Sequence, residues 1–597
     1  MQLSNIKNPS KVESIKDQSR GLCLPIYEDL VSDDITISEE TFQLLKFHGT
    51  YQQDNRDTRI ARKREGLDKE YSFMVRNRIP GGRLTAKQFL AELELAEKFG
   101  NGTIRLTTRQ SIQIHGVLKG NLREVIHSIN HIGLSTQSAC GDVNRNVMCC
   151  PAPIRQDGIR EQMLELADQL ADILRPKTRS YHDLWVTDPE TGEKSNLLAP
   201  EEPEEPLYGA LYLPRKFKVG IALCEDNCID VYDQDIGILG ITEGSRLIGY
   251  NILAGGSMGT TPSDDRCFPA LAKRLTFVTP EQVPVVAAAI VLVQRDHGDR
   301  SDRRQARMKY LIHRWGLERF RDAVASRLDE AASIIGASSD QIPKGLPTSH
   351  PDDVRAAPDH LGWNEQGDGN LFLGIPIQNG RVVDTEEIRL KEGLRKLFTR
   401  LDLPARITAQ QNLLVANVSP SKRTEVEYIL ADHGIPPAND LSALQRQSFA
   451  CPALPTCGLA LTESERALPI VVDQLKAVLE KLGIRDLSLD VRMTGCPNGC
   501  ARPYNAEVGL VGSGHHPKSG QGKYTIFLGG SPLGNRLNVV FQEKVLRDDI
   551  SKILRPVLSH FSTNRQKEEN FGDFCHRLGI KVLQELSGIE GEPLSTP

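Results

Sequence analysis

The chain has 597 residues, of which 39% are hydrophobic and 25% are charged, and its formal net charge at pH 7 is -5. This length exceeds what one hydrophobic core serves, so several domains are expected, and the negative charge argues against a general nucleic-acid binder. The longest apolar run, Val283–Val293, is too short to span a membrane. The N-terminal residues contain no apolar segment typical of a secretory signal, and twelve cysteines in such a chain favour a reducing, cytoplasmic location with metal binding rather than disulfides.

Residues 1–70 are predicted to form an N-terminal arm. Its segment Phe47–Glu65, FHGTYQQDNRDTRIARKRE, is rich in Gln, Asp and Arg, a composition typical of a solvated surface. We expect the arm to pack over the body of the protein. Because it has few apolar anchors, we also expect it to be disordered alone and to become ordered when a partner docks.

Residues 71–142 are predicted to form a strand, a helix and a second strand. TAKQFLAELELAEKFG repeats apolar residues at helical spacing, and TIRLTTRQSIQIHGV alternates apolar and polar residues like a single strand. The period of two places six polar side chains on one face of that strand: Arg105, Thr107, Arg109, Ser111, Gln113 and His115. Such a face is costly to bury without an anionic partner.

Residues 143–355 alternate predicted strands and helices and carry further cations. Arg145 lies in GDVNRNVMCCP, and Lys216 and Lys218 share one face of the strand in LPRKFK. The run Gln294–Ile312 is densely basic and on its own indicates a solvated helix face.

Two further cysteine motifs lie in this region, and the first is interpreted as structural. Cys224 and Cys228 form a C-x3-C pair, but their acidic neighbours would raise a thiol pKa, and no partner pair is evident. Cys149 and Cys150 are adjacent, so both are not expected to enter one cluster.

Residues 356–425 repeat the order of residues 71–142. Aligning Arg105 with Arg406 matches RLTTRQSIQIHGV to RITAQQNLLVANV without a gap, and the same register places Cys150 on Cys451. Only the first copy keeps the cationic face, whereas only the second half carries the complete cysteine set. This division predicts a duplicated chain with one composite site between its halves.

Residues 426–597 contain two cysteine pairs, C-x5-C in ACPALPTCGLA and C-x3-C in TGCPNGCARP. Four thiolates in one fold make a soft anionic cage, suited to zinc or to an iron–sulfur cluster. The five-residue gap of the first pair fits the tight knuckles of structural zinc sites poorly. Surrounding Pro and Gly residues favour irregular loops whose N–H groups can point at sulfur.

These cysteine motifs resemble those of the siroheme and [4Fe-4S] sulfite and nitrite reductases, most closely the hemoprotein (beta) subunits of assimilatory sulfite reductases. The resemblance extends from about Phe47 to the C-terminal tail and includes the FHG-x-YQQD-x-RD segment. It implies an α+β fold of duplicated, pseudo-two-fold architecture, with two ferredoxin-like half-units and two mixed α/β siroheme and cluster domains. It also implies six-electron reduction of sulfite to sulfide, for cysteine biosynthesis, at a siroheme bridged to a [4Fe-4S] cluster.

The resemblance also assigns residues to roles. The cluster ligands are Cys451, Cys457, Cys496 and Cys500, and Cys500 would also bridge to the siroheme iron. The residues that neutralise the substrate and supply protons are Arg78, Arg145, Lys216 and Lys218. The siroheme-binding residues are Arg105, Arg109, Gln113, His115, Arg307, Lys309 and Asn498.

Two alternative functions and the choice of electron donor stay open at this point. A siroheme nitrite reductase, which forms ammonia, is the rival enzyme, although related nitrite reductases tend to have Asn at the position of Lys218. A non-catalytic protein with a structural zinc or cluster is the rival outside the enzymes. The chain shows no flavin or nicotinamide fingerprint, so electrons must come from a separate protein. The arm favours a diflavin reductase (alpha) subunit fed by NADPH over ferredoxin.

Overall fold

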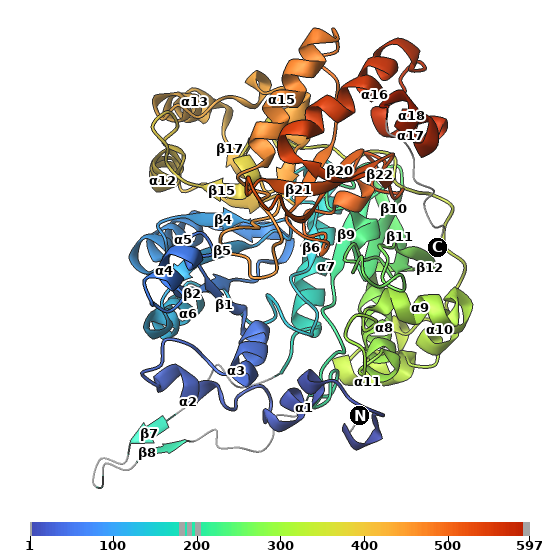
Figure 1. Cartoon of the computed structure of the whole chain (residues 1–597). Coiled ribbons are helices and arrows are strands. Elements are labelled where there is room, and N and C mark those ends of the chain that lie inside the picture. The colour runs from blue at the N-terminus through green and yellow to red at the C-terminus, as the bar shows by residue number, and fades with distance from the viewer. Residues whose placement is uncertain (1–2, 178–184, 188–190, 192–193, 197–204, 589–597) are drawn as a thin grey trace.

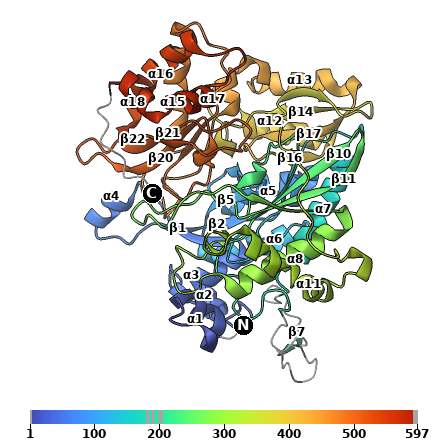
Figure 2. The same cartoon turned by 90° about the vertical axis from the view of Figure 1, so that its right-hand side faces the viewer.

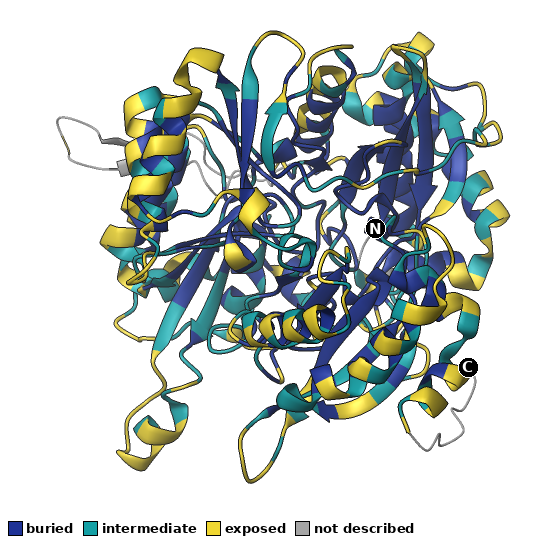
Figure 3. Cartoon of the chain, turned by 90° about the horizontal axis from the view of Figure 1, so that it is seen from above, coloured by how far each residue is buried: buried dark blue, intermediate teal, exposed yellow. Residues whose placement is uncertain are grey.

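The computed structural model describes residues 3–177, 185–187, 191, 194–196 and 205–588. Four five-stranded sheets carry the fold, and a separate two-stranded hairpin joins β7 (Trp185–Thr187) to β8 (Lys194–Asn196). The sheets form two pairs of like topology, so the predicted duplicated α+β architecture is confirmed. Helices cover the outside and the strands lie buried within, as Figure 3 shows by its colours.

The first pair of sheets forms the two ferredoxin-like halves. The first sheet has the order β1-β2-β5-β4-β15, formed by Thr50–Asp54, Tyr71–Arg76, Ile112–Val117, Ile104–Leu106 and Arg381–Val382. The second has the order β13-β14-β17-β16-β3, formed by Gly362–Glu365, Leu371–Ile375, Leu413–Val418, Ala405–Ile407 and Arg83–Leu84. Their helices are α5 (Ala86–Phe99), α6 (Leu122–His131), α12 (Leu390–Leu401) and α13 (Arg423–Asp432).

The two ferredoxin-like halves exchange their edge strands. β15 belongs to the second half in sequence but pairs with β4 of the first sheet, beside which it lies in Figure 1. Reciprocally, β3 of the first half pairs with β16 of the second sheet. One hydrophobic core, from Leu45 to Ile435, fills the space between them. The segments predicted as 71–142 and 356–425 therefore share one core rather than forming two.

The second pair of sheets carries the cysteines. Their strand orders are β12-β11-β10-β9-β6 and β18-β19-β20-β21-β22. In each sheet the first three strands in sequence are parallel neighbours and the remaining two are antiparallel. The strands of the first are β6 (Met148–Cys149), β9 (Val219–Leu223), β10 (Ile236–Glu243), β11 (Arg246–Ala254) and β12 (Lys273–Val278). Those of the second are β18 (Phe449–Ala450), β19 (Val491–Thr494), β20 (Val508–His515), β21 (Gly522–Leu528) and β22 (Val539–Leu546).

Helices pack on these two sheets and bury their apolar faces. The helix α8 (Val283–His297) is apolar on every side and is buried throughout its first three turns, so it forms the centre of the largest core cluster. The helices around the first sheet are α7 (Ile159–Ile173), α8 (Val283–His297), α9 (Met308–Trp315), α10 (Leu317–Ala325) and α11 (Leu328–Ile335). Those around the second are α14 (Ala443–Gln447), α15 (Leu468–Lys481), α16 (Ile550–Asn564), α17 (Phe571–Leu578) and α18 (Ile580–Leu586).

The N-terminal arm is folded onto the body, as predicted, but it is not disordered. Its helices α1 (Lys11–Gln18), α2 (Ile26–Val31) and α3 (Glu39–Leu44) lie beneath the body in Figure 2, and α4 (Arg59–Arg64) projects from it. Four apolar side chains of the arm join the main core: Ile15, Leu22, Leu44 and Phe47. Glu13 forms fully buried ion pairs with Lys16 and with Arg300 of the body. These anchors are few in the sequence, yet all are buried, which is why composition alone suggested disorder.

The single polar-faced strand predicted from Thr103 to Val117 is a hairpin. Thr107 ends the pairing, Gln110 adopts φ 51°, and the chain returns antiparallel so that Arg105 pairs with Gln113. The hydroxyl of Thr107 accepts hydrogen bonds from the amides of Arg109 and Ser111, which closes the turn. Apolar–polar alternation continues through this turn, so the pattern did not reveal it.

Within the described part of the chain, no helix has the length and apolar character needed to cross a membrane.

Candidate functional site

Two cysteine-bearing loops lie against each other at one edge of the fourth sheet. Cys451 follows β18 directly, and Cys496 follows β19, its parallel neighbour. The amide of Gly495 donates to Cys451 Sγ at 3.4 Å, and the amide of Leu461 donates to the carbonyl of Gly495 at 2.8 Å. Because carboxyl ends of parallel strands meet at one sheet edge, the two cysteine pairs come together although they are distant in sequence.

The four predicted cluster ligands interact electrostatically. Burial, and then the charges of the other three cysteines, hold the pKa of Cys451 well above its usual range. Burial and the neighbouring Cys500 raise the pKa of Cys496 to about 11. Thiols in such surroundings ionise when a cation binds among them, which is the behaviour of metal ligands.

The spacing of these sulfurs bears on which metal they suit. A single tetrahedral zinc ion holds its sulfur ligands about 3.8 Å apart. In the described part of the chain, one group of three or more potential metal ligands has all its ligand atoms within 4.8 Å of one another. That group does not contain these four cysteines, so their sulfur atoms are not all within 4.8 Å of one another. The wider spacing fits a cluster of several iron atoms better than one zinc ion.

Cations approach the cysteine loops from the first half of the chain. Burial, and then Arg215, Arg145 and Arg307, hold the pKa of Lys216 well below its usual range, and the charge of Cys500 opposes them. Lys216 makes no hydrogen bond or ion pair with the described residues. An unpaired ammonium beside other cations and a thiol is costly for the empty site, and an anion bound there would remove that cost.

The other predicted substrate residues do not all lie in the same surroundings. The Nζ of Lys218 donates to the carbonyl of Asp233 at 2.9 Å, and burial with Arg307 and Arg109 lowers its pKa to about 7. Burial lowers the pKa of Arg145, but Tyr51 and Cys140 outweigh it, and the net shift is upward.

Arg78 lies elsewhere. Its guanidinium donates to the carbonyl of Ala171 in α7 at 2.6 Å and is surrounded by Arg175, Asp172 and Asp168. The structure therefore does not bring Arg78 to the cationic group. Arg76, two residues earlier on β2, donates to Cys140 Sγ at 3.0 Å and contacts the Gln113 amide. The chain leaves the strand after Arg76, so alternation did not distinguish the two arginines.

Four of the predicted siroheme residues line the ferredoxin-like halves. Arg105 reaches the carbonyl of Ala450, the residue before Cys451, at 2.9 Å and pairs with Glu465. Arg109, in the hairpin turn, donates to the carbonyls of Asn146 and Val219, at 2.7 and 3.0 Å. Gln113 and His115 are also buried, and burial with Arg381, Arg105 and Arg76 holds the pKa of His115 well below its usual range.

The remaining three lie around the second cysteine pair. Arg307 pairs with Asp235 at 2.8 Å, and Lys309 donates to the carbonyl of Gly259 at 2.7 Å. Gly259 lies against the backbone of Asn498, whose amide donates to Cys496 Sγ at 3.4 Å. A glycine-rich loop of the first half thus contacts the cysteine loop of the second.

Residues of the arm complete the site, and the sequence interpretation missed them. The backbone amide of Arg56 donates to the carbonyl of Pro455 at 3.2 Å, and its guanidinium donates to the carbonyls of Cys457 and Ala460. Gln53 Oε1 accepts a hydrogen bond from Nδ1 of His115 at 3.2 Å. The shared YQQDNRD segment was a signal for these contacts, but composition assigned it to the surface.

Three buried atoms provide a test for a large polyanion such as siroheme. The Nε atoms of Arg109 and Arg145 and the Nε2 of His115 are buried and make no hydrogen bond in the described part of the chain. Buried polar groups of this kind are normally paired. Several cations with free donors, arranged around a thiol cage, fit a carboxylate-rich macrocycle that lies beside a cluster.

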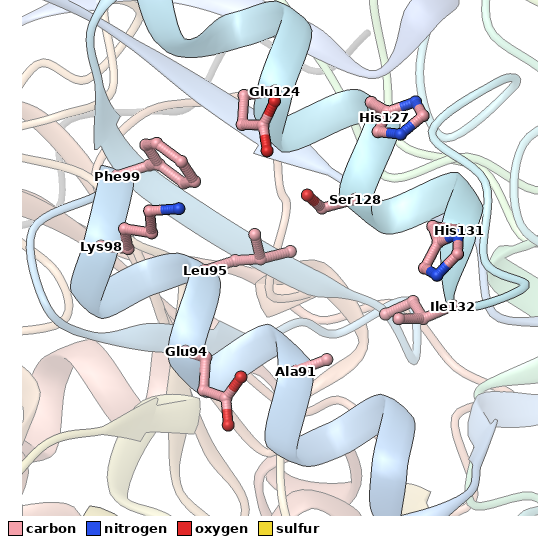
Figure 4. A pocket seen from close by; sticks show the side chains of 10 residues that line it. All are labelled: Ala91, Glu94, Leu95, Lys98, Phe99, Glu124, His127, Ser128, His131 and Ile132. Atoms are coloured by element: carbon pink, nitrogen blue, oxygen red, sulfur yellow. The ribbon is translucent and has the colours of Figure 1, made fainter.

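A surface groove between α5 and α6 lies apart from this group. Its lining includes Glu94, Lys98, Glu124, His127 and His131 (Figure 4). None of these residues is among the ligands or cations described above, so the groove has no part in the site.

Comparisons with known proteins agree with this arrangement. A family profile described as "Nitrite and sulphite reductase 4Fe-4S domain" matches residues 140–331, and one described as "Nitrite/Sulfite reductase ferredoxin-like half domain" matches residues 64–132 and 364–433. The four cysteines lie outside the first match, in the sheet of the same topology in the second half.

Full-length relatives are also found. "Sulfite reductase [ferredoxin]" of Synechococcus elongatus is 43% identical over 97% of this chain and 91% of its own length. "Sulfite reductase [NADPH] hemoprotein beta-component" of Staphylococcus saprophyticus is 42% identical over 96% of this chain and 95% of its own length, and the protein of that name from Bacillus subtilis is 40% identical. The solved structure of Mycobacterium tuberculosis NirA has the same fold, with a TM-score of 0.75 at 22% identity over 97% of this chain and 98% of that one. The chain therefore belongs to the nitrite and sulfite reductase family, and it carries that family's siroheme and [4Fe-4S] cluster.

Proposed function

We propose that the chain is a sulfite reductase hemoprotein that reduces sulfite to sulfide with six electrons. The observation that carries this proposal is Lys216, a half-buried cation without a polar partner in the described structure, beside Arg145 and the Cys500 thiol. Names of full-length relatives, both ferredoxin-dependent and NADPH-dependent, support sulfite as the substrate.

The residues proposed to handle the substrate are Arg76, Arg145, Lys216 and Lys218, with Arg76 in place of Arg78. When bound, the siroheme and the cluster would relay electrons to the substrate and provide the site for its sulfur atom. The cations neutralise a dianion whose oxygens face them, and the two lysines, whose pKa values burial lowers, can each release a proton to a departing oxygen.

The test of this assignment compares Arg76→Met with Arg78→Met. If Arg76 faces the substrate, its loss should lower kcat/KM for sulfite at least tenfold and leave the visible spectrum of the cofactors unchanged. Arg78→Met serves as the matched control and should affect stability more than turnover. A larger catalytic loss in Arg78→Met would restore the original assignment.

Cys500 is proposed to ligate the cluster and to bridge to the siroheme iron. It is the most exposed of the four cysteines, and its charge acts to raise the pKa of Lys216. Replacing Cys500 with Ser should disturb the absorption of both cofactors together, whereas Cys457→Ser should primarily affect the cluster. Purified protein with zinc and no iron among these cysteines would refute the enzyme assignment.

The preference for sulfite over nitrite is proposed to depend on Lys218. An added cation suits a dianion better than a monoanion. Wild-type protein should show a higher kcat/KM for sulfite than for nitrite, and Lys218→Asn should shift the ratio toward nitrite. A clear preference of the wild type for nitrite would make the chain a nitrite reductase instead.

Electrons are proposed to come from a separate donor protein. The case for a diflavin reductase was the arm, but its YQQDNRD segment is packed against the first cysteine loop rather than free for docking. Relatives named for either donor are about equally similar to this chain. Turnover with reduced ferredoxin and with NADPH plus the diflavin subunit, measured on one preparation, identifies the donor.

A further inference from the structure

A second group of metal-ligand side chains lies in the first half of the chain, away from the four predicted cluster cysteines. It consists of Cys150, Asp226, Cys228 and His360, and all four are buried. Cys150 Sγ lies 2.8 Å from Asp226 Oδ2 and 3.6 Å from His360 Nε2, and the last two atoms are 3.0 Å apart. One ligand atom from each residue lies within 4.8 Å of all the others.

This group occupies the position in the first half that the cluster loops occupy in the second. Cys150 follows β6 as Cys451 follows β18, and β6 and β9 are parallel neighbours as β18 and β19 are. From Leu223, the last residue of β9, the sequence LCEDNCIDVYDQDIGI aligns without a gap to GCPNGCARPYNAEVGL after β19, which places Cys228 on Cys500. Asp226 takes the place of Asn498 in this alignment.

The fourth ligand comes from a segment with no role in the cluster loops. His360 ends the linker that leads into β13, and the linker is bound to the loop after β9 by backbone hydrogen bonds. The amide of Arg355 donates to the carbonyl of Cys224 at 2.6 Å, and the amide of Asn227 donates to the carbonyl of Ala356 at 2.9 Å. Three separate segments therefore converge on one small volume.

The donor set and its spacing suit zinc. Ligand atoms about 2.0–2.3 Å from a tetrahedral zinc ion lie roughly 3.3–3.8 Å from one another. The separations among Cys150, Asp226 and His360 are 2.8–3.6 Å, and Cys228 Sγ lies within 4.8 Å of each of their ligand atoms, so binding requires shifts of about 1 Å or less. Two sulfurs, one imidazole and one carboxylate favour zinc over magnesium, calcium or manganese, which prefer oxygen ligands.

The charges around the group also balance. Two thiolates and a carboxylate bring three negative charges, and a neutral imidazole brings none. A zinc ion supplies two positive charges, and Arg160, whose guanidinium donates to Asp226 Oδ2 at 3.0 Å, supplies the third. A buried site with no net charge avoids the large cost of an unpaired charge, and Arg160 fixes the orientation of the carboxylate.

We propose that Cys150, Asp226, Cys228 and His360 bind one structural zinc ion, which ties the linker before β13 to the ends of β6 and β9. The ion is distinct from the [4Fe-4S] cluster and occupies its pseudo-symmetric counterpart. Protein side chains fill all four coordination positions of the ion, so none is left for a substrate, as in structural rather than catalytic zinc sites.

The first test is elemental analysis of the full-length holoprotein, produced in medium that contains zinc and iron and then passed over a chelating resin. We expect about one zinc per chain in addition to the iron of the siroheme and cluster. The zinc K-edge spectrum of the same sample should show two sulfur ligands at about 2.3 Å and two nitrogen or oxygen ligands at about 2.0 Å. This spectrum is blind to iron, so it reports on the proposed site alone.

Variants separate this site from the cluster. Cys228→Ser and His360→Gln should lower zinc at least fivefold and leave iron content and the siroheme spectrum unchanged. Cys224→Ser is the matched control, because Cys224 is a buried cysteine of the same loop that lies outside the ligand group. It should retain zinc.

Three results would overturn the proposal. Zinc below a tenth of an ion per chain in the wild type is the first, and a K-edge spectrum without sulfur ligands is the second. The third is a Cys150–Cys228 disulfide, found by mass spectrometry of the unreduced protein. The wild-type measurements decide the question even if the variants fail to fold.

Discussion

Arg56 links the N-terminal arm to the first cysteine loop, and its removal should loosen that loop. Its guanidinium donates to the carbonyls of Cys457 and Ala460, and a hydrogen bond from a charged donor contributes about 1.5–3 kcal/mol. Arg56 is half-buried, so we take the lower value for each bond, which gives about 3 kcal/mol for Arg56→Leu. A loss of this size raises the equilibrium constant for opening of the loop about a hundredfold.

Hydrogen exchange of the peptides that contain residues 451–461 measures this opening directly. Arg56→Leu should raise their exchange rates about a hundredfold and accelerate loss of the cluster to a chelator, with little change in the rest of the second half. Asp57→Asn is the matched control, because Asp57 pairs with Arg466 at the surface and its loss should cost under about 1 kcal/mol. Unchanged exchange in Arg56→Leu, or an equal change in Asp57→Asn, would refute this reasoning.

Three further predictions concern buried carboxyl groups. Burial raises the pKa of Glu92 to about 7, so the fold favours the neutral form of this side chain. The wild type should therefore lose about 3 kcal/mol of stability as the pH rises from about 5 to 8. Glu92→Gln should remove that loss, as measured by urea titrations at about pH 5 and at about pH 8. Burial also raises the pKa of Glu507 to about 7, but both its oxygens accept backbone N–H groups, so Glu507→Gln should destabilise by about 2–3 kcal/mol even at pH 8; a neutral effect would contradict this. Glu13→Gln leaves Lys16 and Arg300 buried without their carboxylate partner and should lower the free energy of unfolding by about 3–5 kcal/mol. A change in melting temperature no larger than that of a surface variant would contradict this prediction.

The duplication and the cluster cysteines could be predicted from the sequence because both depend on local signals. Cysteine is rare and its spacings are fixed, so two pairs within fifty residues indicate a metal site without knowledge of the fold. The repeat shows in an ungapped alignment in which Cys150 and Cys451 coincide. Strand topology then confirmed the repeat, since parallel and antiparallel pairings recur in the same order.

The rest depended on turns and on contacts between distant segments. Arg76 and Arg78 have the same parity, and the chain's departure from β2 decides which one reaches the cationic group. The arm looked polar because its few apolar anchors are separated by many charged residues. Cys228 lacked a partner in the sequence because its neighbours in space, Cys150 and His360, come from other segments.

The exchange of β3 and β15 between the ferredoxin-like sheets constrains how the chain can be synthesised. β3 pairs with β16, roughly 300 residues later in the chain, which takes about 15–60 s to translate at 5–20 residues per second. During that interval the first sheet lacks the edge strand β15, and β3 has no partner. An unpaired sheet edge on a nascent chain can pair with strands of other chains. Aggregation of nascent chains should therefore limit the yield of this protein. The yield should improve when translation of one chain is completed faster than nascent chains meet one another.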